Sequence, residues 1–340
     1  MGKVTKNNSL HSAKKEKNDE FYTQLSDIEN ELKHYKHHFK DKVVYCNCDD
    51  PRVSNFFHYF SYSFEHLGLK RLIATCYKSQ DKDLFSQNDS EEAVYLIYDG
   101  DKDGNNIPDD NEIEVKSLKG DGDFNSDECI ELLTQADIVV TNPPFSLFRD
   151  YVAQLIEHEK KFIIVGNQNA ITYKDIFSLI RDNKIWLGTK SGDMKFIVPD
   201  HYEMRSTRSW RDEEGTNWRS LGNTCWFTNL DHPKRHEEII LWKTYDPDYY
   251  PHYDHYDAIN VGKVAEIPVD FDGAMGVPIT FLNKYNPEQF EILDSNDFRV
   301  DESVPFKDHG LIKDKDGTID GKATYVRILI RNRNPIIKQR

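Results

Sequence analysis

The sequence predicts an α/β protein with a mostly parallel sheet, helices on both faces of that sheet, and a smaller β-rich region toward the C-terminus. Two observations lead to this prediction. Apolar strand patterns alternate with helical patterns up to about residue 185. Beyond that point helical periodicity weakens, and Trp, Tyr, Pro, His and Asn become frequent. We therefore divide the chain into a flexible basic arm (1–17), an α/β domain (18–200) and a β-rich region (201–340).

The α/β domain begins with a helix and continues as strands that alternate with helices. Leu25, Ile28, Leu32 and Tyr35 recur at helical spacing and predict a helix over 24–39. The strands that follow are apolar without strict alternation, which is typical of strands buried on both faces. The further elements are a strand at 42–48, a helix ending at Gly68, a strand at 71–77, a hairpin formed by 92–100 and 113–118, a helix at 126–135, a strand at 137–142, a helix at 147–159, a strand at 161–167 and a helix at 172–183.

The β-rich part of the chain is predicted from short apolar or aromatic runs. In the last of these runs Arg327, Arg331 and Arg333 alternate like the outward-facing residues of an edge strand. The predicted short strands are 186–188, 195–199, 225–230, 239–245, 277–282 and 325–332.

Composition limits the class of protein. The 340 residues suffice for one large domain or two smaller ones, and 38% hydrophobic with 12% aromatic residues is typical of a folded chain. No run of about 18 apolar residues predicts a transmembrane helix, and the first residues lack the apolar core of a signal peptide. The five cysteines are scattered and odd in number, so we expect reduced thiols and a cytoplasmic protein.

The net charge of −15 at first argues against a nucleic-acid partner. Its distribution changes this conclusion, because residues 81–128 hold 16 acidic and 4 basic residues. The rest of the chain therefore sums to only −3. The first 17 residues carry five Lys, and the last 19 carry six basic residues and no acidic one. Basic surfaces are compatible with this distribution, although solvated faces explain such clusters equally well.

Within the acidic stretch, the run "DGDKDGNNIPDD" begins like a calcium-binding loop. Asp99, Asp101 and Asp103 stand at the first, third and fifth positions, with Gly104 at the sixth. The twelfth position is Asp110 where a bidentate Glu is expected, and the eighth is polar. We therefore interpret the run as an acidic hairpin tip and predict no metal site, with ion binding as the weaker alternative.

The run "DIVVTNPPFSLF" follows a buried strand with Asn142, Pro143, Pro144 and Phe145. Prolines cannot continue a strand ladder, so the strand ends at Thr141 and the chain leaves in a stiff, extended turn. In a largely parallel sheet, ligands bind beyond the carboxyl ends of the strands, where this turn lies. A plain strand-ending turn is the alternative interpretation.

The four residues suit methylation of an exocyclic amino group. Such a nitrogen is a poor nucleophile, because its lone pair is delocalised into the ring. Two acceptors, the Asn142 side-chain oxygen and the Pro143 carbonyl, can bind its two hydrogens and draw it toward tetrahedral geometry. Phe145 offers a face on which a base can stack. A base taken from a duplex must first flip out of the stack.

An ordered set of motifs resembles the EcoRI-type adenine-specific DNA methyltransferases, which use S-adenosylmethionine. The motifs are "DEFYTQ", "YCNCDDPRVSNFF", "GDGDF", "DIVVTNPPFSLFR", "KFIIVGN" and "GVPITFLNKYNPEQFE". The resemblance runs from about residue 15 to 335. It implies a Rossmann-like methyltransferase sheet over 18–200, a target-recognition region over 201–340, and Asn142, Pro143, Pro144 and Phe145 as catalytic residues.

The resemblance also implies cofactor-binding positions. Each has a structural alternative: Thr23 could cap a helix, Asp49 and Asp50 could form an Asx turn, and Asp123 could serve turn chemistry, with Asp121 as a rival acid. The glycine-rich Phe-x-Gly-x-Gly turn of related enzymes is missing here. The implied cofactor-binding residues are Phe21, Tyr22, Thr23, Asp49, Asp50, Pro51, Asp123 and Phe124.

Target recognition is expected in the region 201–340, where basic and aromatic side chains suit phosphates and bases. Phe196 or Trp226 is a candidate second wall around the flipped base, although an aromatic residue in a strand is more often core. The DNA-contact candidates are Arg205, Arg208, Trp210, Arg211, Trp218, Arg219, Lys234 and Arg235.

The sequence thus predicts a site-specific DNA adenine methyltransferase acting on double-stranded DNA, as the modification enzyme of a restriction–modification system or a phage or orphan equivalent. No membrane, metal or obligatory protein partner is predicted, and a cognate endonuclease would act separately. No Cys follows a Pro, which excludes the Pro-Cys nucleophile of cytosine-ring enzymes. The alternatives are an amino-group methyltransferase acting on RNA or protein, a non-catalytic DNA-binding module, and a calcium-binding structural protein.

Overall fold

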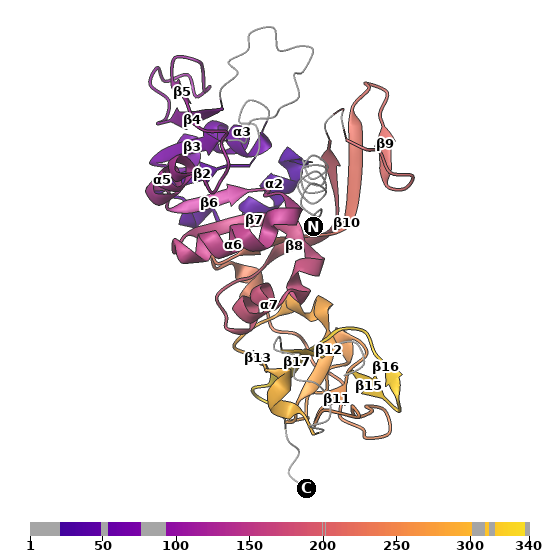
Figure 1. The fold of residues 1–340 in the computed structure, drawn as a ribbon. Helices are drawn as coiled ribbons and strands as arrows, with labels where there is room; N and C mark the ends of the chain where they lie inside the picture. The colour runs from indigo at the N-terminus through magenta and orange to yellow at the C-terminus, as the bar shows by residue number, and fades with distance from the viewer. Residues whose placement is uncertain are drawn as a thin grey trace, which may run out of the picture. The chain divides into compact units, whose positions relative to one another are not determined.

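The computed structural model describes residues 21–48, 54–75, 93–198, 200, 202–300, 310–312 and 317–336 (Figure 1). The chain divides into two compact units. The first unit comprises Met1–Gln168 and Lys190–Leu230, and the second comprises Asn169–Thr189 and Asp231–Arg340. The predicted arm at 1–17 lies outside the described residues. The functional division at residue 200 stays a prediction, because the compact units are interleaved along the sequence.

The first unit is built on a ten-stranded sheet with the order β1-β8-β10-β7-β6-β2-β3-β4-β5, and β9 pairs with β10. The strands are β1 (Tyr22–Thr23), β2 (Val43–Cys46), β3 (Arg71–Thr75), β4 (Val94–Tyr98), β5 (Ile113–Ser117), β6 (Ile138–Thr141), β7 (Lys161–Asn167), β8 (Trp186–Ile197), β9 (Ser209–Arg211) and β10 (Asn217–Thr228).

The four central strands are parallel, and the flanking strands are not. β7, β6, β2 and β3 pair in parallel, and β2 and β6 are buried at every position, as strands covered on both faces must be. The predicted hairpin is confirmed as antiparallel β4 and β5. β10 returns antiparallel to β7, and β1 lies antiparallel to β8. The prediction of a mostly parallel sheet was therefore too simple, since the sheet is mixed.

Helices cover both faces of the central strands, as predicted. Val44 and Cys46 of β2 share a core with residues of α2 (Leu25–Leu32) and α3 (Asn55–Tyr62). Tyr45, which alternation turns to the opposite face, interacts with Cys129 of α5 (Asp127–Gln135). α6 (Phe148–Glu157) contributes Tyr151 to the same side, where its hydroxyl meets Asn47 at the end of β2.

The predicted ends of two helices have different outcomes in the structure. The helix predicted over 24–39 ends early at Leu32 and is followed by a 3₁₀ turn. The predicted stop at Gly68 is confirmed: α4 (Phe64–Leu67) ends there with φ +63°, a conformation that favours glycine. The 3₁₀ helices are η1 (Lys36–His38), η2 (Phe145–Leu147), η3 (Gln168–Thr172), η4 (Pro233–His236), η5 (Val264–Glu266), η6 (Ile279–Lys284) and η7 (Ser295–Phe298).

The second unit contains α7 (Lys174–Arg181) and a small sheet with the order β11-β12-β17-β13. β14 also pairs with β17. The strands of this sheet are β11 (Ile259–Asn260), β12 (Met275–Pro278), β13 (Phe290–Ile292), β14 (Leu311–Ile312) and β17 (Arg327–Asn332). A separate two-stranded sheet is formed by β15 (Thr318–Ile319) and β16 (Lys322–Ala323).

Four predictions for the short strands were wrong. The run 277–282 is strand only up to Pro278, where β12 ends, and continues as the 3₁₀ helix η6. Segments 186–188 and 195–199 are not separate, because both fall on the continuous β8, whose last residue is Ile197. The run 239–245 forms only an isolated bridge at Lys243, and Ile240 is 85% exposed. β17 is a central strand, not an edge strand, and Arg327 on it is buried.

No helix among the described residues could cross a membrane. Among the described residues, Cys46, Cys48, Cys129 and Cys225 are not joined in disulfides.

Candidate active site

The Asn-Pro-Pro-Phe turn lies where two neighbouring parallel strands end. β6 stops at Thr141, whose hydroxyl donates a hydrogen bond to the carbonyl of Asn47, just beyond β2. The side chain of Asn47 in turn accepts a 2.5 Å hydrogen bond from the Tyr151 hydroxyl of α6. Burial raises the pKa of Tyr151 well above its usual value, so the phenol stays protonated as a donor. The turn is thus held from the sheet and from the helix that follows it.

Asn142 is buried, with 6% of its surface exposed, and the two ends of its amide have different surroundings. Its Nδ2 donates a 2.5 Å hydrogen bond to the carbonyl of Phe21. Because a carbonyl can only accept, this bond fixes which end of the amide carries the oxygen. The Oδ1 atom is buried and has no hydrogen-bond partner among the described residues. A buried acceptor of this kind is costly unless a ligand supplies a donor.

The two prolines carry the chain away from the sheet in an extended form. Both peptide bonds that precede them are trans. Pro144 has φ −54° and ψ 127°, and its carbonyl accepts a 3.0 Å hydrogen bond from Leu147 N in the following turn. α6 begins directly afterwards at Phe148. The turn therefore links β6 to α6 with little conformational freedom.

Phe145 is partly buried against an aromatic cluster. Its ring centroid lies 5.5 Å from that of Phe21, with an angle of 34° between the ring planes. Phe21 also contacts Phe196 at 5.5 Å and Tyr202 at 6.0 Å. Phe196 is fully buried in this cluster, and Trp226 is fully buried beside Phe56, so both side chains are part of the core.

The segment Phe21, Tyr22 and Thr23 forms an edge of the site. β1 pairs with β8 through Thr23 and Phe196, and the Thr23 carbonyl accepts a 2.7 Å hydrogen bond from Asn55 Nδ2. Thr23 is not a helix cap, since Gln24 occupies the N-cap of α2. The Thr23 hydroxyl is buried without a hydrogen-bond partner in the described part of the chain. Two buried polar atoms without a described partner therefore belong to residues near Phe21: Thr23 Oγ1 two residues along the chain, and Asn142 Oδ1 on the side chain that is hydrogen-bonded to the Phe21 carbonyl.

The segment Asp123 and Phe124 precedes α5. Asp123 Oδ1 accepts a 2.8 Å hydrogen bond from Asn125 N, which is the turn chemistry expected of this position. Phe124 is buried with its ring centroid 5.1 Å from that of Tyr151. Its carbonyl accepts a 3.0 Å hydrogen bond from Gln154 Nε2. Residues Asp49, Asp50 and Pro51 lie outside the described residues, and α3 is capped by Ser54 instead.

Asn47, Tyr151 and Gln154 were not predicted from the sequence. They connect the Asn-Pro-Pro-Phe turn to the Asp123–Phe124 segment through side-chain and carbonyl hydrogen bonds. The one available signal was the polar Asn47 between two cysteines at the end of an apolar strand. Nothing in its spacing indicates a partnership with Tyr151, 104 residues later.

The predicted DNA-contact residues of the first unit lie on and around β9 and β10, the hairpin labelled in Figure 1. Trp210 and Trp218 stack with 4° between their planes and 6.1 Å between ring centroids. Arg205, Arg208 and Arg211 are exposed, although Arg208 pairs with Asp193 at 3.2 Å. Arg219 differs, because it is buried and donates to the carbonyl of Thr207.

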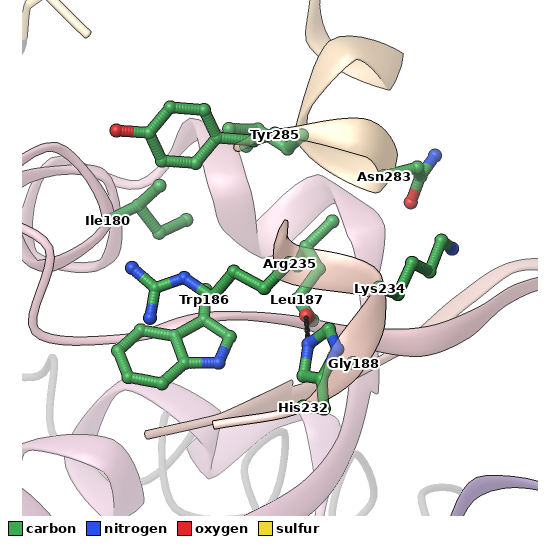
Figure 2. A pocket seen from close by; sticks show the side chains of 10 residues that line it. Ile180, Trp186, Leu187, Gly188, His232, Lys234, Arg235, Asn283 and Tyr285 are labelled. Atoms are coloured by element: carbon green, nitrogen blue, oxygen red, sulfur yellow. Dashed lines mark hydrogen bonds between the residues drawn. The ribbon is translucent and has the colours of Figure 1, made fainter. Parts of the chain in front are cut away.

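The other two candidates belong to the second unit, on η4 (Figure 2). The Arg235 guanidinium lies 3.5 Å from the centroid of the Trp186 ring and donates to Asn183 Oδ1. The Lys234 ammonium donates a 2.7 Å hydrogen bond to the Thr189 carbonyl. Both cations therefore have internal partners, and Arg235 is buried. These contacts favour a structural role for Arg235.

Comparison with known proteins gives consistent findings. A family model described as adenine-specific methyltransferase EcoRI matches residues 9–333. Type II methyltransferase M.EcoRI of Escherichia coli is 51% identical over 337 residues, covering 98% of this chain and 99% of the relative. Type II methyltransferases M.MgeORF184P of Mycoplasma genitalium and M.MpnI of Mycoplasma pneumoniae are 39% and 38% identical, covering 95% and 96% of this chain and 98% and 99% of the relatives. No solved structure matches the chain.

Proposed function

The chain belongs to the EcoRI family of adenine-specific methyltransferases, and we propose that it methylates the exocyclic amino nitrogen of an adenine flipped out of duplex DNA. S-adenosylmethionine is the methyl donor. The reaction modifies a specific site, as the methylating half of a restriction–modification system does. The mixed sheet with helices on both faces is consistent with a methyltransferase fold, and we assign it to the Rossmann-like class.

The observation that carries this proposal is the orphaned oxygen of Asn142. An adenine amino group offers two N–H donors, and Asn142 Oδ1 is a buried acceptor with no partner among the described residues. The Phe21 carbonyl holds the opposite end of the amide, so the oxygen does not need to reorient when substrate arrives. The second acceptor is the Pro143 carbonyl, and Phe145 stacks against the base. Together these groups localise the lone pair on the nitrogen that attacks.

The residues around Phe21 fit S-adenosylmethionine, whose contribution is an activated methyl group on a sulfonium. Thr23 Oγ1 is a buried polar atom without a described partner and is available to the methionine part of the cofactor. Asp123 is partly exposed, so its second carboxylate oxygen can accept from the amino group of an adenine ring. Phe124 would pack against that adenine ring, and the carboxylates of Asp49 and Asp50 would bind the methionine ammonium.

On the DNA side, we propose that β9 and β10 carry the contacts outside the catalytic turn. The exposed residues Arg205, Arg208 and Arg211 suit phosphates, and Trp210 is an exposed aromatic above its partner Trp218. Arg219, Lys234 and Arg235 are left out of this proposal because they are buried or half-buried and donate to internal protein acceptors. The wider region 201–340 remains our candidate for target recognition.

The proposal is tested by methyl transfer from radiolabelled S-adenosylmethionine to three substrates in parallel: unmethylated plasmid DNA, total RNA and total protein. We expect label in DNA alone, and N6-methyladenine after digestion. Label confined to RNA or protein would overturn the DNA assignment. Absence of label from all three, with the cofactor bound, would overturn the assignment of an active enzyme.

A further inference from the structure

The loop between β4 and β5 has a calcium-loop pattern in a register that starts at Asp101. In this register Asp101, Asp103 and Asn105 occupy the first, third and fifth positions, Asp109 the ninth and Glu112 the twelfth. The register that starts at Asp99 is wrong, because Asp99 forms a two-bond ion pair with Arg71 at 2.6 and 2.9 Å. The glutamate expected at the twelfth position is therefore present.

Three carboxylates converge within this loop. One carboxylate oxygen from each of Asp101, Asp103 and Glu112 lies within 4.8 Å of the others. Lys116 of the same hairpin forms an ion pair at 3.0 Å with Glu114, which is not one of these three carboxylates. A small volume bounded by three such oxygens suits a hard cation, which prefers oxygen ligands.

Glu112 supplies an independent indication that a ligand belongs there. Only 5% of its surface is exposed, although glutamate is rarely buried without a partner. Its Oε1 accepts a 2.5 Å hydrogen bond from Lys102 N, but Oε2 is buried and has no hydrogen-bond partner among the described residues. A buried carboxylate oxygen without a donor is strongly unfavourable unless a cation neutralises it.

The backbone of the loop is already arranged around the first aspartate. Asp101 accepts from the amides of Asp103, Gly104 and Asn106 at 3.1, 2.7 and 2.6 Å. Asn106, at the sixth position, has φ +57°, where calcium loops place a glycine for the sharp turn. Asparagine tolerates this left-handed conformation better than most residues do. The departure from glycine at this position is therefore compatible with the loop.

We propose that the loop Asp101–Glu112 binds one Ca²⁺ ion. Asp101, Asp103, Asn105 and Glu112 supply side-chain oxygens, Ile107 supplies its carbonyl, and Asp109 binds directly or through water. The site has a structural purpose. The loop is joined to α4 through Asp101 N and Glu65 Oε1 at 3.2 Å, and to β3 through the Arg71–Asp99 pair. A bound ion would therefore fix the tip of the β4–β5 hairpin, which forms one edge of the sheet, relative to α4 and β3, independently of methyl transfer.

The test is calorimetric titration of the EGTA-treated full chain with CaCl₂, alongside thermal unfolding with CaCl₂ and with EGTA. The wild type should bind about one Ca²⁺ per chain with Kd at or below about 1 mM and unfold at a higher temperature with calcium. Glu112→Gln should bind at least about tenfold more weakly, because it removes a bidentate anionic ligand. Asp110→Asn is the matched control, since Asp110 is exposed and occupies a non-ligand position in the new register; its Kd should stay within about twofold of wild type.

Three results would overturn the proposal. The first is the absence of both binding heat and a thermal shift in the wild type at about 5 mM Ca²⁺, well above the weak limit for such loops. The second is equal weakening by Asp110→Asn and Glu112→Gln, which would indicate diffuse charge attraction. The third is equal affinity for Mg²⁺. Asp103→Asn, at an exposed position, replaces Glu112→Gln if circular dichroism shows that the latter is misfolded.

Discussion

Asn142 uses the two ends of its side-chain amide for different purposes. The nitrogen donates a hydrogen bond to the Phe21 carbonyl, and the oxygen is buried without a hydrogen-bond partner among the described residues. The sequence identified this residue from its neighbours, because an Asn followed by two prolines after an apolar strand is an unusual pattern. It could not identify the Phe21 carbonyl as the anchor, since a contact across 121 residues leaves no trace in local spacing.

Asn142→Ala should leave cofactor binding nearly unchanged and lower the rate of methyl transfer by about 10²- to 10³-fold. The reason is that the lost acceptor acts mainly in the transition state, as with a single oxyanion-hole group. Asn142→Asp keeps an acceptor oxygen and should retain part of the activity. Calorimetry with S-adenosylmethionine and single-turnover kinetics measure the two quantities. A normal rate in the alanine variant would refute the catalytic assignment.

Phe145→Ala should weaken binding to DNA that carries a mismatch at the target base by roughly 5- to 150-fold, because base–aromatic stacking is worth roughly 1–3 kcal/mol. Phe145→Leu is the control, since it preserves apolar packing against Phe21 without an aromatic face. Fluorescence anisotropy with labelled duplex gives the affinities. Unchanged binding in both variants would mean that Phe145 only fills space beside Phe21.

At the scale of elements, the sequence predicted what depends on local pattern and missed what depends on tertiary pairing. The buried strands β2, β6 and β7 were predicted because they are continuously apolar. β8 was predicted as two pieces because its middle is polar and largely exposed, so no apolar signal joins them. The run 239–245 shows the opposite error, since its apolar Ile240 and Trp242 are exposed and form no strand.

Gly166 of β7 packs against Phe148 at the start of α6, and this contact leaves no room for a side chain at position 166. A Cβ on Gly166 would lie 2.6 Å from the Phe148 ring and 2.9 Å from the Phe227 ring. Gly166→Ala should therefore lower the free energy of unfolding by about 1–3 kcal/mol through overpacking. Gly120→Ala is the control, because its nearest contact is at 3.8 Å. Urea unfolding distinguishes them, and equal stability of the two variants would contradict the described packing.

We expect His232 to make the second unit sensitive to acid. Its buried ring donates a 3.0 Å hydrogen bond from Nε2 to the Leu187 carbonyl, and burial lowers its pKa from 6.5 to about 4. Between these values the unfolded chain binds more protons than the folded chain, so stability falls as pH decreases from 6.5 toward 4. The expected loss from this residue is up to about 3 kcal/mol.

The pH dependence is measured by urea unfolding of wild type and His232→Gln between about pH 4.5 and 7.5, the range in which His titrates. The Gln variant keeps a donor for Leu187 and cannot titrate, so its stability should fall less over the acid half of this range. Identical pH slopes in the two proteins would show that His232 is not the source of acid sensitivity.

At the scale of the whole molecule, the chain forms two compact units, each built from two separate stretches of the sequence. The candidate catalytic turn lies entirely in the first unit. The stretch 169–189 leaves the α/β unit and joins the second one, which no change in composition marks at that point. The strand–helix alternation was sufficient to predict the central sheet. The boundary between the units was not predictable, because it depends on tertiary contacts between distant segments and not on local sequence pattern.

The most direct test of the account is expression of the chain in a bacterial host that lacks DNA methylation, followed by modification-sensitive single-molecule sequencing of the genome. The account predicts N6-methyladenine at one short sequence motif, and a much smaller methylated fraction at that motif in cells that express Asn142→Ala at the same level. Unmodified genomic adenine, in cells whose protein is folded and binds S-adenosylmethionine, would contradict it.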